Sequence, residues 1–248
     1  MFPIRDHNPS GRRPYVTWTL MAANIGLFLV YWPQLDSEWA EMRFFSEWGV
    51  TPYRVSAGAG LHTLATSMFL HAGWMHLAGN MLFLWIFGDN MEDAFGHLRY
   101  GLFYLAAGFA AAVLQIAADP HSMVPMVGAS GAIAGVLGGY LLLYPRARVD
   151  ILVIIIFFVR IVPVPAWIML GLWFGFQVVA GLGADPSGGG VAYWAHAGGF
   201  AAGLVLTVPA WLRRGGVRFW AHTHGEPPHP EASYRIGQTS IPTVRRRR

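Results

Sequence analysis

The chain has 248 residues, of which 54% are hydrophobic and only 12% charged. Soluble domains carry roughly twice that charged fraction, so we expect most of this chain to lie in a membrane. The formal net charge is +4, but the arginines lack the stripe interleaved with aromatics that nucleic-acid binding requires, so we expect no nucleic-acid partner. The absence of cysteine excludes disulfides, thiolate metal sites and cysteine nucleophiles.

Six apolar segments follow one another along the chain, several of them near the 20 residues that span a bilayer. They cover about residues 15–32, 74–87, 100–118, 128–144, 166–182 and 191–212. The apolar run 151–159 is interrupted by Arg160, Pro163 and Pro165, so we expect it at the inner interface, with the fifth span beginning near Pro165. The predicted organisation is an N-terminal tail (1–14), a transmembrane domain (15–212) and a disordered basic tail (213–248).

Arginines indicate the orientation. They precede the first segment and follow the fourth and the sixth (Arg5, Arg12, Arg13; Arg146, Arg148; Arg213, Arg214, Arg218). With six spans all three groups lie on one side, which is the cytoplasmic side by the positive-inside rule. We therefore predict an all-α, six-helix membrane bundle with both termini cytoplasmic, multi-pass in a bacterial inner membrane. The basic tail can also bind anionic lipid.

Polar side chains inside spanning segments are costly and are therefore functional candidates. Those in the outer halves of the second, fourth and sixth segments are His71, His76, Asn80, Ser130 and His196. A helix rises about 1.5 Å per residue, which puts Ser130 roughly 21 Å, His196 roughly 24 Å and His76 roughly 20 Å from the predicted cytoplasmic boundary. The three segments thus deliver these side chains to one depth.

Small residues recur every fourth position in two of these segments. Gly131, Gly135 and Gly139 form one such row in the fourth segment, and Ala195, Gly199 and Gly203 form another in the sixth. Such rows let two helix backbones approach closely, which would bring Ser130 to His196.

Ser130 by itself could equally be a small packing residue. A phosphate-binding loop would need a lysine, which the chain lacks, and there is no H-E-x-x-H zinc motif. We expect no cofactor and no metal.

Three motifs in order resemble those of the rhomboid intramembrane serine proteases. They are HAGWMHLAGNMLFLWIFGDNMEDAFG in the second segment, VGASG at the start of the fourth and AHAGGFAAG in the sixth. The resemblance covers about residues 48–212. Two family features are absent: the position four residues after the serine, often tyrosine, is Ala134, and the Trp-Arg pair of the first loop is missing, although Glu47–Trp48 lies nearby.

The resemblance implies a serine endopeptidase that cuts transmembrane helices of membrane proteins near their outer end. Ser130 would be the nucleophile and His196 its base. The oxyanion would be bound by the Ser130 backbone N–H with His76 and Asn80, and Gly128 would allow the tight backbone. His71 would be structural or would retain water.

Two alternatives stand beside this interpretation. An inactive rhomboid-like protein that binds transmembrane clients would have the same fold. A small-solute transporter would show internal repeats, and we find no convincing one.

Overall fold

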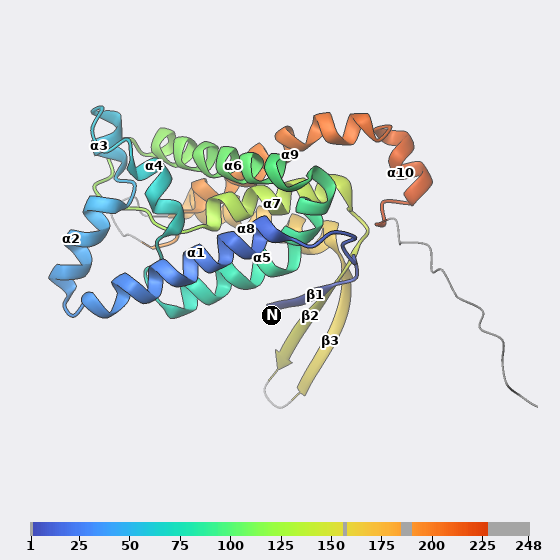
Figure 1. The fold of residues 1–248 in the computed structure, drawn as a ribbon, viewed down its shortest axis with the longest axis horizontal. Coiled ribbons are helices and arrows are strands. Elements are labelled where there is room, and N and C mark those ends of the chain that lie inside the picture. The colour runs from blue at the N-terminus through green and yellow to red at the C-terminus, as the bar shows by residue number, and fades with distance from the viewer. Residues whose placement is uncertain (1, 156–157, 185–189, 228–248) are drawn as a thin grey trace, which may run out of the picture.

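The computed structural model describes the chain apart from residues 1, 156–157, 185–189 and 228–248 (Figure 1). Its helices are α1 Tyr15–Tyr31, α2 Glu38–Trp48, α3 Pro52–Ser56, α4 Thr63–Thr66, α5 Trp74–Phe95, α6 His97–Ala118, α7 Ser130–Leu143, α8 Ala166–Gly183, α9 Tyr193–Arg213 and α10 Val217–Thr223, with short 3-10 turns at Trp32–Gln34 and Ser67–Phe69. Its strands are β1 Phe2–Asp6, β2 Arg148–Ile155 and β3 Phe158–Pro165.

The long helices coincide with the six apolar segments of the sequence. Among the described residues, four helical stretches are long and apolar enough to cross a membrane, namely Tyr15–Gln34, α6, α8 and α9, and α7 is a shorter apolar helix. The chain is therefore a multi-pass helical membrane protein. The count of six spans and the cytoplasmic position of the termini stay predictions.

Helix α7 occupies the centre of the bundle. It contacts α5, α6, α8 and α9, and nearly all of its residues are buried. At about 1.5 Å per residue its 14 residues extend roughly 21 Å, less than the thickness of a bilayer core. A helix of this length cannot reach both surfaces of the core, so at least one end of α7 lies below a membrane surface.

The small-residue rows of α7 and α9 face each other, as the sequence predicts. A Cβ added to Gly199 would overlap the carbonyl oxygen of Gly131, and one added to Gly203 would overlap that of Gly135. The two backbones are therefore in direct contact, and side chains at these positions would force the helices apart.

A three-stranded sheet lies at one end of the bundle, in strand order β1-β2-β3, and the all-α expectation did not include it. Strands β2 and β3, which contain the described residues of the run 151–159, pair as an antiparallel hairpin, and the N-terminal strand adds to it. A run rich in isoleucine and valine suits a strand because β-branched side chains pack well on a pleated surface. Helix α8 begins directly after Pro165, as predicted.

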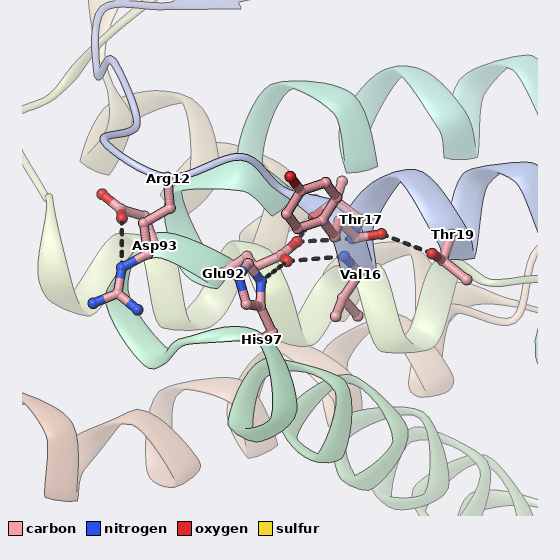
Figure 2. Close-up of polar contacts among 8 residues, drawn as sticks. Arg12, Val16, Thr17, Thr19, Glu92, Asp93 and His97 are labelled. Carbon is pink, nitrogen blue, oxygen red and sulfur yellow. Dashed lines mark hydrogen bonds and ion pairs between the residues drawn. The ribbon is translucent and has the colours of Figure 1, made fainter.

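We call the end of the bundle where α1 begins, α7 ends and α8 begins the hairpin end, and the opposite end, where α7 and α9 begin, the serine end. At the hairpin end the Glu92 carboxylate of α5 is fully buried and joins three helices (Figure 2). It accepts 2.8 Å hydrogen bonds from the Val16 and Thr17 backbone N–H groups at the start of α1, and it pairs with His97 of α6 at 2.5 Å. A carboxylate suits this place because the first turn of a helix has unpaired N–H groups.

Part of the predicted disordered tail is ordered. Helix α10 packs back on the bundle, where the Trp220 indole N–H donates to the Leu142 carbonyl at 2.9 Å. Residues 228–248, which hold the rest of that tail and its four final arginines, lie outside the described residues.

Candidate active site

Ser130 and His196 are hydrogen-bonded to each other. Ser130 is the first residue of α7 and His196 lies in the first turn of α9, so the contact between the two glycine rows brings the helix starts together. The Ser130 Oγ lies 2.8 Å from the His196 Nε2, and both side chains are half-buried. A hydroxyl held against an imidazole nitrogen is the arrangement that activates serine as a nucleophile.

The second ring nitrogen of His196 is held by α8. Its Nδ1 lies 2.8 Å from the Gln177 Oε1, and Gln177 is only 4% exposed. Because the Gln177 Oε1 can only accept a hydrogen bond, the neutral ring carries its proton on Nδ1, and its Nε2 is left to accept a hydrogen bond from the Ser130 hydroxyl. The Trp173 ring, one turn away on α8, lies 5.8 Å from the imidazole centroid. These α8 side chains support the ring where Ala134 offers no tyrosine.

Gln177 was missed by the sequence analysis, although a signal was present. It is the single amide in α8, a helix that is otherwise apolar. A polar side chain inside a spanning segment is a functional candidate by the same reasoning that selected Ser130 and His196.

His76 faces the serine across Gly128. Gly128 has a φ of +131°, which favours glycine, and a Cβ there would lie 2.8 Å from the His76 Nε2 and 3.4 Å from the Ser130 Oγ. The His76 Nδ1 accepts a 3.3 Å hydrogen bond from the Ala72 backbone N–H, which leaves the proton of the neutral ring on Nε2. His76 thus presents a donor beside the hydroxyl.

Asn80 lies one turn further along α5, and its amide is used within that helix. It is buried, and its Nδ2 donates to the His76 carbonyl at 2.9 Å. His71 is fully buried with its ring 5.1 Å from that of His76, and its backbone is bonded to the Tyr31 hydroxyl. The structure thus gathers Ser130, His196, His76 and Gly128, with Asn80 next to them and His71 behind.

Two cavities differ in their relation to this site. One of about 20 Å³ adjoins Ser130, Gly128 and Ser67, and it is large enough for about one water molecule. A larger one of about 300 Å³ lies at the hairpin end between β1, α1 and α5, away from Ser130. The described residues contain no group of three or more histidine, aspartate or glutamate side chains that could hold a metal ion.

Residues 58–225 match the family model of the rhomboid domain. A relative from Arabidopsis thaliana, RHOMBOID-like protein 4, is 38% identical over 58% of this chain and 32% of its own length. The Rhomboid protease GluP of Bacillus subtilis is 36% identical over 59% of this chain and 26% of its own length. Rhomboid protein 1, mitochondrial, of Saccharomyces cerevisiae is 31% identical over 56% of this chain and 39% of its own length. The chain therefore spans well under half the length of these relatives.

Proposed function

Because the chain belongs to the rhomboid family, we propose that it is an intramembrane serine endopeptidase that cleaves transmembrane helices near their outer end. The observation that carries this proposal is the 2.8 Å hydrogen bond between the Ser130 Oγ and the His196 Nε2 inside a membrane bundle. The relative from Bacillus subtilis is named as a rhomboid protease, which supports the same proposal.

In the proposed first step Ser130 attacks the scissile carbonyl carbon. As the Oγ–carbon bond forms, the hydroxyl proton passes to the His196 Nε2, and the ring becomes a cation. Collapse of the tetrahedral intermediate breaks the carbon–nitrogen bond, and the leaving amine takes the proton from His196. A water molecule then hydrolyses the acyl-enzyme by the same route. Gln177 stabilises the cationic ring, because its Oε1 accepts a 2.8 Å hydrogen bond from the Nδ1–H group.

The oxyanion needs donors where the negative charge develops. The Ser130 backbone N–H lies in the first turn of α7, whose N–H groups have no intrahelical partners and whose dipole is positive at this end. The His76 Nε2 proton adds a second donor. The Asn80 amide becomes a third when its side chain turns from the His76 carbonyl. Gly128 keeps the space between these donors clear.

Substrates are proposed to be membrane-spanning segments of other proteins. A helix in lipid hides its carbonyl groups in hydrogen bonds and must unwind before a serine can attack. Small or helix-breaking residues near the cut therefore favour cleavage. We place the protein in a bacterial plasma membrane, with its arginine-rich segments on the cytoplasmic side.

Labelling by a fluorophosphonate probe tests the nucleophile. Wild type and Ser67→Ala are expected to be labelled, because Ser67 lines the same small cavity but its hydroxyl has no hydrogen bond to a histidine among the described residues. Ser130→Ala is expected to lose labelling, and His196→Ala to be labelled far more slowly. Labelling of Ser130→Ala at the wild-type rate would refute the assignment. Inert wild type across several probes and substrates would favour the client-binding alternative.

A further inference from the structure

One face of the sheet is apolar and exposed. Residues paired across an antiparallel sheet lie on the same face, so the pairs Phe2↔Leu152, Leu152↔Ile161 and Ile154↔Val159 define what we call the outer face. Its members Phe2, Ile154, Val159 and Ile161 are 57–62% exposed. On the opposite face Val149 and Ile151 pack on the bundle, whereas Arg160 further along that face is exposed.

Such a face is unusual for a sheet beside water. An antiparallel sheet with one face on the core normally presents a polar second face, because its side chains alternate. Here Val149 and Ile151 are buried in the core, and yet the alternating positions Leu152 and Ile154 are apolar too. An exposed apolar surface of this kind marks contact with a membrane or another protein.

Polarity changes along the same face. Towards the helices the Asp150 carboxylate binds Arg5 at 2.7 Å and His7 at 2.8 Å, and Arg148 is exposed nearby. Towards the turn of the hairpin the face is apolar. A ribbon that is charged at its base and apolar towards its turn matches the gradient from lipid phosphates to acyl chains.

The sheet is continuous with a surface that faces lipid. Strand β3 leads without a loop into α8, a span candidate that exposes Trp167, Leu172 and Phe176. An eight-residue strand extends about 26 Å, so a hairpin that continued along the helix axes would carry its apolar half far into water. Figure 1 instead shows the hairpin slanting back beside the helices, below α5. Its apolar half therefore lies level with the bundle and not beyond it.

We propose that the outer face is a lipid-binding surface, which inserts its apolar half into the headgroup–acyl boundary of the leaflet at the hairpin end. The sheet has open edges, and unpaired backbone groups are excluded from the hydrocarbon centre. The edge strand β3 also contains Pro163 and Pro165, which remove two N–H donors. Both features limit insertion to the boundary layer. The charged base lies at the level of the phosphates.

Labelled single cysteines test this depth in the full chain, which has no cysteine of its own. Ile154→Cys and Ile161→Cys carry a nitrobenzoxadiazole label in vesicles of phosphatidylethanolamine and phosphatidylglycerol. Leu172→Cys on α8 is the lipid-facing reference, and Arg148→Cys is the matched control at the base of the same face. Each label is quenched separately by lipids with a nitroxide near the glycerol end of the acyl chain and by aqueous iodide. Val159→Cys replaces any variant that does not melt cooperatively.

Labels at 154 and 161 are expected to be quenched by the lipid nitroxide to nearly the extent of the Leu172→Cys label and to be protected from iodide. The Arg148→Cys label is expected to be reached by iodide. Strong iodide quenching at 154 and 161 without nitroxide quenching would overturn the proposal. Protection from both quenchers would also overturn it, because protein would then cover the face. Dipolar broadening between spin labels at 161, rising with protein density, would identify a second copy as that cover.

Discussion

Replacing Gln177 with leucine tests how the catalytic histidine is held. Leucine is apolar and of similar size, so the main change is the loss of the acceptor that lies 2.8 Å from the His196 Nδ1. Because Gln177 is only 4% exposed, water has little access to take the place of its oxygen. The ring loses a partner for the proton that must stay on Nδ1.

The expected size follows from the charge that develops on the ring. A hydrogen bond between neutral groups contributes about 0.5–1.5 kcal/mol, and one to a charged group about 1.5–3 kcal/mol. His196 is neutral before the attack and cationic in the transition state, so the larger range applies to kcat/KM. At about 1.4 kcal/mol per factor of ten, Gln177→Leu should lower kcat/KM roughly 10- to 150-fold. Most of the loss should appear in kcat, since the neutral state loses less.

The assay is cleavage of a transmembrane substrate in proteoliposomes, with kcat and KM measured separately across pH. Gln177→Glu keeps an acceptor and is the matched control, so it should retain much more activity than Gln177→Leu. A Gln177→Leu enzyme with wild-type kcat would refute the assigned role. Equal loss in both variants, together with lower melting temperatures, would indicate a structural role instead.

Three further predictions concern the scaffold. Gly199→Ala should destabilise the protein by roughly 1–3 kcal/mol in thermal unfolding, because the added Cβ would overlap a carbonyl oxygen. Gly175→Ala adds its Cβ in open space and should be neutral or stabilising. Equal melting temperatures of the two variants would contradict this. Glu92→Gln should lower the free energy of unfolding by about 1.5–3 kcal/mol, because a buried charged acceptor is lost. Asp93→Asn should lower it by under about 0.5 kcal/mol, because the ion pair of Asp93 with Arg12 is at the surface. The reverse order in denaturant unfolding would contradict the role of Glu92. Burial raises the pKa of Asp6 from 3.8 to about 7. Between these two pH values the folded chain holds a proton that the unfolded chain releases. The free energy of unfolding should therefore fall as the pH rises from about 4 to about 7. Asp6→Asn should reduce this slope, and an unchanged slope would exclude Asp6 as a source of it.

The pairing of Ser130 with His196 could be predicted because two independent patterns agree. Both residues are polar in apolar segments, and each lies beside a row of small residues with a period of four. On a helix, residues spaced four apart lie on one face, so each row predicts a face where another helix can approach closely. The structure shows this approach, because Gly131 and Gly199 are in backbone contact. Depth counting added His76 because helix rise is nearly constant.

Other features depend on tertiary contacts that one segment does not reveal. Whether Gln177 meets His196 depends on the rotation of α8, which the apolar periodicity of that helix leaves open. The hairpin was missed because a short isoleucine- and valine-rich run fits either an interfacial segment or a strand, and only its pairing with β1 and β3 decides. Likewise, the burial of Glu92 at the start of α1 depends on the packing of two helices that are far apart in the chain.

The central claim is that Ser130, with His196 as its base, cuts membrane-spanning helices. N-terminal sequencing of the products from a panel of transmembrane substrates, incubated with wild type, Ser130→Ala and His196→Ala in proteoliposomes, tests it most directly. The account predicts new N-termini near the outer ends of the substrate helices with wild type and none with either variant. The same products from Ser130→Ala, or cuts confined to segments outside the membrane, would contradict it.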